Sequence, residues 1–306
     1  MTIPLLLRAV LWMVGTLLSF SVMALSVRGL AGRFSIFEIL TVRTALGLAI
    51  LIVLGLARPA LLRTISRRRL DLQVSRNVAH FTGQYLWALS LTLLPLATVF
   101  ALEFTMPAWT IVLAMLFLGE TMNRGRVGSV VCGFIGVLVI LRPGVATVDP
   151  ASLLVLAAAF CYASANIFTK KLTVTETTYA IVFWMNLIQM PLGYIGSDPL
   201  FFLKIDAQML IPAIGVGVSG LTAHYCLTNA LAIADATVVV PLDFMRLPLI
   251  AIVGWMFYGE PLDFLVFAGA AIIILGVIWG LKSEARKSGP RSATRRPDPV
   301  AALDSE

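Results

Sequence analysis

Residues 99–112 read VFALEFTMPAWTIV, and this apolar stretch carries one charged side chain, Glu103, in its interior. If the stretch crosses a bilayer, a charge at its centre costs roughly 2.5–3.5 kcal/mol on insertion scales. Such a cost predicts that Glu103 has a partner elsewhere in the fold, or a function.

The composition indicates that lipid is the solvent of the whole chain. Of its 306 residues 59% are hydrophobic and 13% are charged, and the mean hydropathy is +0.94. A soluble domain is about one-quarter charged. The net charge of +7 comes from short arginine clusters between apolar runs, which is typical of membrane topology and not of nucleic-acid binding. Three cysteines without paired spacing (Cys132, Cys161 and Cys226) predict neither a disulfide framework nor a metal site. No cofactor is expected.

The apolar runs predict an all-α membrane protein with ten transmembrane helices. About 20 apolar residues cross the hydrocarbon core, which is about 30 Å thick. Runs that are apolar on every side exclude a barrel, whose strands alternate. The predicted spans are 9–27, 35–56, 74–93, 96–118, 126–141, 152–169, 178–196, 208–232, 236–258 and 263–281.

Most of the 23 lysines and arginines fall on one side of these spans. The predicted inner side holds Arg8, the cluster from Arg58 to Arg76, and the basic tail. Because short loops rich in Lys and Arg stay in the cytoplasm, both termini are expected there. The segment 283–306 is predicted to be a disordered basic cytoplasmic tail, which can contact anionic lipid.

The chain resembles itself at a shift of 140 residues. Thr82 and Tyr85 then meet Thr222 and Tyr225, Gly119-Glu120 meets Gly259-Glu260, and "LEF" at 102–104 meets "LDF" at 242–244. Glu103 therefore has a counterpart carboxylate, Asp243. Five spans per half are an odd number, so the halves have opposite topology. Inverted repeats of this kind give secondary transporters their alternating access.

Two segments resemble a known family. Residues 116–144, "LFLGETMNRGRVGSVVCGFIGVLVILRPG", resemble the end of an EamA domain of the drug/metabolite transporter superfamily. Residues 255–280, "WMFYGEPLDFLVFAGAAIIILGVIWG", resemble the end of a second copy. Arg43 resembles the common arginine of the second helix. The resemblance implies one five-helix repeat over 1–144, another over 145–282, and a place in the bacterial inner membrane. It leaves the substrate open, and Arg246 is a departure that suggests anionic or zwitterionic substrates.

Polar and aromatic residues inside the spans are the candidates for substrate binding or coupling, because intramembrane ionisable groups are functional by default. Asp243 and Arg246 are three residues apart and can pair locally, whereas Glu103 has no basic residue near it in sequence. The candidate set is Arg43, His80, Tyr85, Trp87, Glu103, Trp109, Trp184, Asn186, His224, Tyr225, Asp243 and Arg246. Glu38, near an outer helix end, is a weaker candidate.

Charges of both signs suit a small polar or zwitterionic metabolite, either amino-acid-like or carboxylate-bearing. We therefore expect a secondary active transporter, in the export direction. A carboxylate inside a span can also exchange a proton, so Glu103 is the expected coupling residue.

Two alternatives remain at this stage. Residues 217–220 read GVSG, which resembles the nucleophile motif of rhomboid proteases and would make Ser219 a nucleophile. A membrane scaffold without transport activity would also explain the hydrophobicity. Small-residue pairs, Gly276 with Gly280 and Ser129 with Gly133, predict close helix packing. That packing either joins two protomers or seats helices within one.

Overall fold

The computed structural model describes residues 3–30, 32–93, 102–141, 150–246, 249, 252, 256 and 264–287. This part of the chain is built from eleven α-helices and two 3-10 helices. The long helices are α1 (Ile3–Leu30), α2 (Ile36–Ala57), α4 (Leu70–Leu93), α6 (Met106–Leu118), α7 (Arg124–Leu141), α8 (Ser152–Leu172), α9 (Thr178–Ile195), α10 (Ala207–Ile233) and α13 (Phe264–Lys287). The short ones are α3 (Pro59–Arg63), η1 (Phe201–Lys204), α11 (Ala236–Val239) and η2 (Val240–Met245).

Among the described residues, four helices are long enough and apolar enough to cross a membrane by length and composition, namely Leu5–Val27, Ile36–Ala57, Ser152–Leu172 and Ala207–Ile233. Shorter apolar helices cover Met106–Leu118, Ala236–Met245 and Phe267–Ser283. The prediction of an all-helical membrane protein is thus confirmed, but ten regular spans are not.

The predicted spans 96–118 and 236–258 are the ones that depart from regular helix. The chain turns at Phe104 and Thr105, and α6 begins only at Met106; residues 94–101 lie outside the described part. The second span opens as α11, continues as the 3-10 helix η2, and is described only at isolated positions after Arg246. Pro107 and Pro241 each lie in the first turn of the element after the interruption. A proline there is tolerated because the first N–H groups of a helix lack partners, whereas inside a helix it breaks a hydrogen bond.

The helices expose apolar side chains along their outer faces, as a lipid environment requires. On α1, Leu7, Leu11, Val14, Leu18 and Val22 are all exposed and recur every three or four residues. That spacing makes one stripe along a helix. Ala9, Met13, Thr16, Leu17 and Ser21, which lie between them in sequence, are buried.

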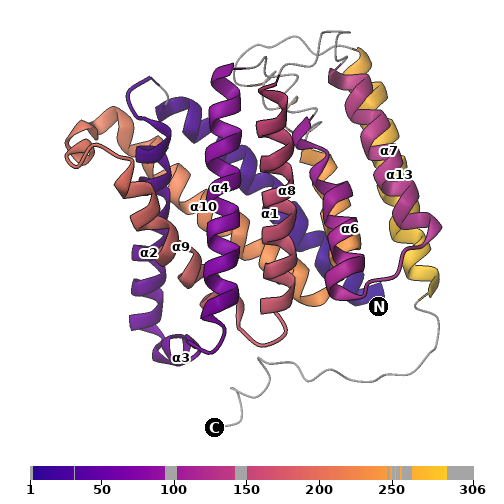
Figure 1. The fold of residues 1–306 in the computed structure, drawn as a ribbon, viewed down its shortest axis with the longest axis horizontal. Helices are drawn as coiled ribbons and strands as arrows, with labels where there is room; N and C mark the ends of the chain where they lie inside the picture. Colours follow the sequence, from indigo (N-terminus) through magenta and orange to yellow (C-terminus); the bar gives the residue numbers. More distant parts are fainter. Residues whose placement is uncertain are drawn as a thin grey trace.

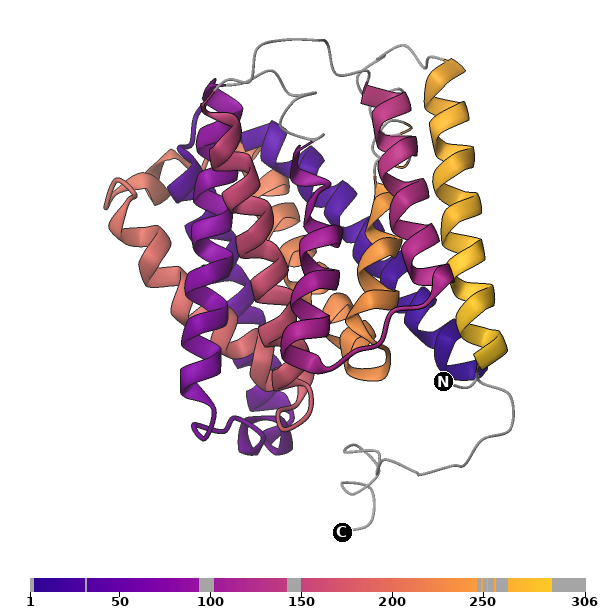
Figure 2. The ribbon, with the colours of Figure 1, turned by 45° about the vertical axis from the view of Figure 1, so that its right-hand side comes forward.

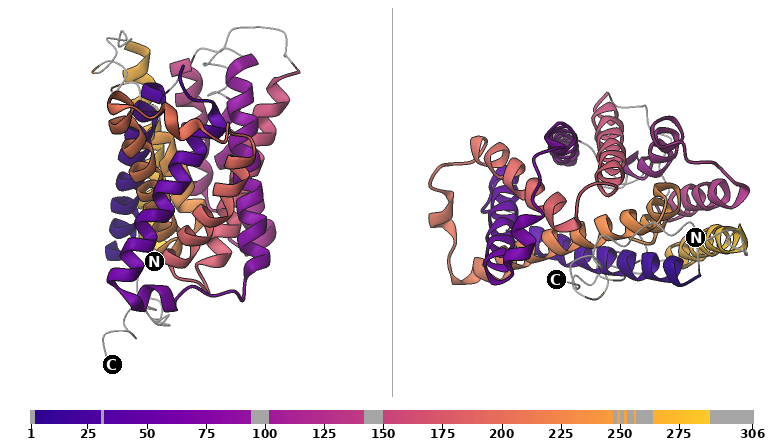
Figure 3. Two further views of the ribbon diagram at one scale, coloured as in Figure 1. Left: turned by 90° about the vertical axis from the view of Figure 1, so that its left-hand side faces the viewer. Right: turned by 90° about the horizontal axis from the view of Figure 1, so that it is seen from below.

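The helix pairings follow the internal repeat. Helix α1 packs on α10 and α4 packs on α8, while α2 packs on α9 and α7 on α13. In the repeat, α1 corresponds to α8 and α4 to α10, so the first two pairs are copies of each other. The other two pairs each join a helix to its own counterpart. Seen from below, α1 and α10 form one long side and α4, α8 and α6 the other, with the two remaining pairs at opposite ends (Figure 3).

Equivalent helices run in opposite directions. In Figure 1, α1, α4 and α7 run upward, whereas their counterparts α8, α10 and α13 run downward. Helix α2 runs down and its counterpart α9 runs up. The two halves are therefore inverted with respect to each other, as the odd number of spans per half predicts. The start of α1, the arginine-rich α3 connection and the end of α13 all lie at the lower end.

Small residues seat α7 against α13 within one chain, and the two helices stand side by side (Figure 2). The Ser129 hydroxyl donates to the Gly276 carbonyl over 2.7 Å. A Cβ built on Gly280 would lie 1.9 Å from the Ser129 Oγ. The small residues at 129, 276 and 280 thus allow this packing inside the protomer.

The lower end of the bundle is closed by contacts between the halves. The Glu120 carboxylate accepts hydrogen bonds from the backbone N–H groups of Ala236 and Thr237, both 3.0 Å long, and from the Thr237 hydroxyl over 2.6 Å. A carboxylate at a helix N-terminus is favourable because it meets unpaired N–H groups and the positive end of the helix dipole. Nearby, within the second half, Lys170 of α8 donates to the carbonyls of Leu231 and Ala234 at the end of α10.

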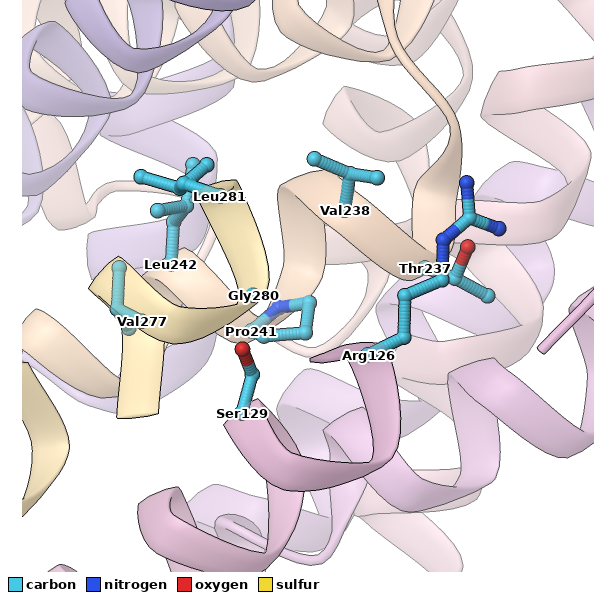
Figure 4. Close-up of a pocket in the computed structure, with 9 residues that line it drawn as sticks. All are labelled: Arg126, Ser129, Thr237, Val238, Pro241, Leu242, Val277, Gly280 and Leu281. Carbon is cyan, nitrogen blue, oxygen red and sulfur yellow. The ribbon is translucent and has the colours of Figure 1, made fainter. Parts of the chain in front are cut away.

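A pocket of about 10 Å³ lies beside this seam, between α7, α11, η2 and α13 (Figure 4). Ser129 lies beside Gly280 on one side, and Arg126 extends to Thr237 on the other. A single water molecule needs about as much space, so this pocket cannot hold a metabolite.

Candidate functional site

A cavity much larger than this pocket lies between the two halves in the described part of the chain. Its volume is about 270 Å³, at the low end for small-molecule sites. Helices α1, α2, α4, α8 and α10 line it, together with the interrupted segments that carry Glu103 and Asp243. Seven of the predicted site residues line this cavity, namely Arg43, His80, Trp87, Glu103, His224, Asp243 and Arg246.

One wall of the cavity holds three charged residues, Glu103, Asp243 and Arg246, which we call the acidic cluster. The Arg246 Nη2 lies 2.9 Å from Glu103 Oε1 and 3.1 Å from Asp243 Oδ2. The indole N–H of Trp87 donates to the other Glu103 oxygen over 2.7 Å. The partner of Glu103 thus lies in the opposite half of the chain, 143 residues away. Two carboxylates share one guanidinium, which leaves the cluster with one uncompensated negative charge.

The acidic cluster sits where the two halves of the repeat meet. Phe104 and Phe244, the repeated phenylalanines of "LEF" and "LDF", stack on each other with ring centroids 5.7 Å apart and planes 16° apart. The preceding residues, Glu103 and Asp243, are consequently close enough to bind one side chain. The position equivalent to Arg246 in the first half is Met106, which also lines the cavity. The repeat is therefore symmetric in its carboxylates and asymmetric in its cation.

A second wall holds Arg43 of α2 and Arg76 of α4, which we call the arginine cluster. Arg43 donates through Nη2 to the side-chain oxygens of Gln189 (3.0 Å) and Gln84 (3.3 Å). Arg76 donates to Asn77 Oδ1 over 2.9 Å and to the Thr169 hydroxyl over 2.7 Å.

A hydrogen-bonded bridge joins the two arginines. The Gln189 amide, which accepts from Arg43, donates to the Asn77 oxygen over 3.0 Å, and Asn77 also accepts from Arg76. The same amide lies 3.0 Å from the His80 Nδ1. Gln189, Asn77 and His80 are all buried. The arginines are consequently held in fixed positions by neutral side chains.

Aromatic rings occupy the space between the two clusters. The His80 and His224 rings are 4.8 Å apart in an edge-on arrangement, and Tyr162 lies 5.8 Å from His80. The Phe20 ring lies 5.9 Å from His224 and 5.6 Å from the Arg246 guanidinium. These rings offer an apolar surface to a planar part of a ligand.

Three predicted aromatic residues, Tyr85, Trp109 and Tyr225, do not line the cavity. They are 42%, 38% and 39% exposed, and each packs against an aromatic ring of a neighbouring helix. Partial exposure on a membrane helix is typical of rings that face lipid or its interface.

Trp184 and Asn186 of α9 also lie away from the cavity. The Trp184 indole donates to the backbone carbonyl of Ser66, in the lower connection, over 3.0 Å. Asn186 is buried beside Gly47 and donates to the Val182 carbonyl one turn earlier, over 2.8 Å. Both serve the packing of α9.

Glu38 has a structural role at the start of α2. It forms a capping box with Ser35 and an ion pair of 2.8 Å with Lys204. The same contact raises the pKa of the Lys204 ammonium, since the carboxylate favours the charged form. This pair ties η1 to the top of α2.

Arg76 is the main residue that the sequence interpretation missed. It was counted with the basic inner cluster, but it is 2% exposed and lines the cavity. The available signal was the polar pattern of α4, where Gln73, Asn77, His80 and Gln84 recur every three or four residues. That spacing puts polar groups along one helix face. On a membrane helix, such a face points to a cavity.

The protease alternative is wrong. The Ser219 hydroxyl donates to the Gly215 carbonyl of its own helix over 2.6 Å. His224 faces His80 and Phe20 in the cavity.

Two consecutive stretches of the chain, residues 7–142 and 149–281, match the model of the EamA-like transporter family. The chain belongs to this family. The resemblance predicted from the Gly-Glu segments is thus confirmed, and the protein is a membrane transporter and not an enzyme.

Three bacterial proteins similar to this chain are transporters of small molecules. The riboflavin transporter of Vibrio cholerae is 32% identical over 204 residues, which cover 67% of this chain and 68% of that one. The S-adenosylmethionine uptake transporter of Rickettsia prowazekii is 28% identical, with 69% and 71% covered. The pseudopaline exporter of Pseudomonas aeruginosa is 27% identical, with 91% and 97% covered.

The fold is also similar to that of a solved structure. A crystal structure of a protein 17% identical in sequence matches with a TM-score of 0.76, over 92% of this chain and 99% of that one. At this identity the match concerns the fold alone.

Proposed function

We propose that this EamA-family protein is a secondary active transporter that exports a small polar or zwitterionic metabolite by alternating access, coupled to protons. The observation that carries the proposal is the cavity between two inverted halves, with an acidic cluster on one wall and an arginine cluster on another. Ligand sites of inverted-repeat transporters lie at the interface of the repeats.

Alternating access fits the way in which the two ends of the bundle differ. The lining of the cavity reaches Val27 and Ile36, near the upper ends of α1 and α2. At the lower end, Glu120 of the first half joins the second half through hydrogen bonds to the start of α11. We interpret this arrangement as a state open at the upper end, from which breakage of the lower contacts leads to the opposite state.

The substrate chemistry follows from the charges. A molecule with an anionic and a cationic group can place each beside the matching wall. Among the named substrates of the relatives, S-adenosylmethionine carries a carboxylate and an ammonium group, whereas riboflavin has no ionised group at neutral pH. The cavity therefore favours the amino-acid-like class.

Proton coupling is assigned to the acidic cluster. Glu103 and Asp243 share one arginine, so a proton or a cationic substrate group is needed to neutralise the second carboxylate. Competition between the two for one site is the usual basis of exchange between a proton and a cation. Export is supported by the pseudopaline exporter, whose alignment spans more of this chain than those of the other two relatives reported above.

The orientation proposed here places the lower end of the bundle in the cytoplasm of a bacterial inner membrane. Single cysteines at Ser66 and Ser197, introduced in a variant without native cysteines, lie at opposite ends of the bundle. An impermeant thiol reagent added to intact cells should label position 197 and not position 66. Labelling of position 66 instead would reverse the proposed orientation.

Transport itself is tested with purified protein in liposomes loaded with a defined mixture of polar metabolites that includes S-adenosylmethionine and riboflavin. After a pH gradient is imposed, mass spectrometry measures what leaves the liposomes. We expect gradient-dependent release of at least one amphoteric metabolite. If no metabolite is released, or if liposomes without the protein release the same amount, the proposed function is rejected.

A further inference from the structure

We infer that Arg43 and Arg76 form a binding site for an oxyanion group, a carboxylate or a phosphate, of the transported molecule. The inference rests on the proposed function for its biological meaning, but the site is argued from the geometry of the two arginines and is tested by binding alone.

Both arginines carry their charge in a buried position. Arg43 is 3% exposed and Arg76 is 2% exposed. Within the described part of the chain neither arginine forms an ion pair, and their acceptors are Gln84, Gln189, Asn77, Thr169 and the Met185 sulfur. Buried charges are normally paired because desolvation is expensive. Two adjacent arginines without a counter-ion therefore indicate that the counter-ion arrives with a ligand.

The two guanidinium groups differ in how many of their nitrogens bind protein groups. Arg76 uses Nε, Nη1 and Nη2 in its contacts with protein groups. Arg43 donates to described residues only through Nη2. Its Nε and Nη1 have no hydrogen-bond partner among these residues, and they are not fully buried. Those two nitrogens are thus available to the cavity. Arg43 would bind the oxyanion directly and Arg76 would add positive charge.

The fold fixes the Arg43 side chain through contacts along its stem and at its guanidinium. The stem of Arg43 lies on Gly220 of α10, where a Cβ would come within 2.7 Å of both Cγ and Cδ. Gln189 and Gln84 hold the far end of the guanidinium. The Nη2 end of the guanidinium is thus fixed, and Nε and Nη1 can each donate one charge-assisted hydrogen bond to an oxyanion.

The acidic cluster excludes the third arginine of the cavity, Arg246, as an anion-binding group. Arg246 is already neutralised by Glu103 and Asp243, so it is not free to bind an anion. The sequence interpretation connected Arg246 with anionic or zwitterionic substrates, whereas the geometry assigns the anionic group to Arg43 and Arg76.

The test is the thermal unfolding of the purified full-length protein, followed by tryptophan fluorescence at constant ionic strength. The probes are benzoate, phenyl phosphate and neutral benzamide, which share a ring and differ in charge. We expect benzoate or phenyl phosphate to raise Tm while benzamide does not, and the more effective anion to distinguish a carboxylate site from a phosphate site. An absent response to both anions, or an equal response to benzamide, would overturn the inference.

Variants locate the response. Hydrogen bonds to charged groups contribute about 1.5–3 kcal/mol, so Arg43→Gln should weaken the apparent affinity for the effective anion about 10- to 100-fold. Arg76→Gln should weaken it as well. Arg33→Gln is the matched control, because Arg33 pairs with Asp206 at the surface, away from the cavity. Should Arg76→Gln fail to fold, Arg43→Gln decides alone; a wild-type response in Arg43→Gln would reject the site.

The design separates this inference from the proposed function. The shift in Tm reports anion binding in the absence of a pH gradient. A normal anion response without transport would reject the transport proposal alone, and transport without an anion response would reject the anion site alone.

Discussion

The acidic cluster and the arginine cluster line the same cavity, but their charges are balanced in opposite ways. Arg246 is bound by carboxylates from both halves of the repeat, over 2.9 and 3.1 Å. Arg43 and Arg76 are bound by amides, a hydroxyl and a sulfur. Loss of Arg246 leaves the two buried carboxylates of the acidic cluster without a cation. The arginine cluster has no counter-ion in the described part of the chain. The comparison predicts that the acidic cluster contributes to the stability of the fold, and it supports the proposal that the arginine cluster binds a ligand.

The largest effect is expected from Arg246→Gln. It leaves Glu103 and Asp243 buried without a cation, and removal of one partner of a buried pair typically costs about 3–5 kcal/mol. Unfolding by denaturant should show a loss of that order, and transport should be absent. Arg33→Gln, at an exposed ion pair, should stay within about 1 kcal/mol of wild type. Equal stabilities for the two variants would contradict the comparison.

The next effect concerns the asymmetry of the repeat. Because Met106 is the counterpart of Arg246 and also lines the cavity, an arginine at position 106 can reach the same pair of carboxylates. Combining Met106→Arg with Arg246→Met should therefore restore about half of the stability lost in Arg246→Met alone, on the scale of a buried pair. No recovery in the double variant would show that the two carboxylates do not lie across an axis of symmetry.

A smaller effect on stability is expected from Glu103→Gln. The amide keeps an acceptor for Trp87, and Arg246 keeps Asp243 as its partner. A loss of about 1.5–3 kcal/mol is therefore expected, as for a charge-assisted hydrogen bond. Transport should lose its dependence on the pH gradient, since the shared negative charge is gone. Unchanged gradient dependence in liposomes would remove Glu103 from the coupling mechanism.

The smallest effect on stability is expected from Arg43→Gln, although its effect on transport should be among the largest. Removal of a buried charge without a counter-ion relieves its desolvation, and the glutamine can still hydrogen-bond to Gln189. The unfolding free energy should stay within about 1 kcal/mol of wild type or rise. A loss as large as that of Arg246→Gln would show that Arg43 has a structural counter-ion.

The sequence was sufficient for the features that depend on local spacing and on repetition. Asp243 and Arg246 pair as their separation of three residues predicts, and the repeated "LEF" and "LDF" segments meet through Phe104 and Phe244. The interruptions near Glu103 and Asp243 were signalled only by Pro107 and Pro241. A proline marks where a helix can break, but not whether it kinks or gives way to a turn.

Contacts between distant segments were not predictable from one sequence. The sequence around Glu103 does not indicate that Arg246 forms an ion pair with it. This ion pair, seen in the structure, gives Glu103 its cationic partner. Arg76 was assigned to membrane topology because a basic residue at a helix end usually stays in water. Whether a side chain points into the cavity depends on how its helix is rotated about its axis, and tertiary packing sets that rotation. This is why the sequence did not show that Tyr85, Trp109, Trp184, Asn186 and Tyr225 lie away from the cavity.

The most direct test of the two-walled cavity is metabolite profiling of cells that contain the wild-type protein, Arg43→Gln, or no transporter. The account predicts that the metabolites accumulating outside cells with the wild type carry both an anionic and a cationic group. With Arg43→Gln, present in the membrane at the same level, they should return to the level of cells without transporter. Export of an uncharged metabolite by wild type and Arg43→Gln alike would contradict the account.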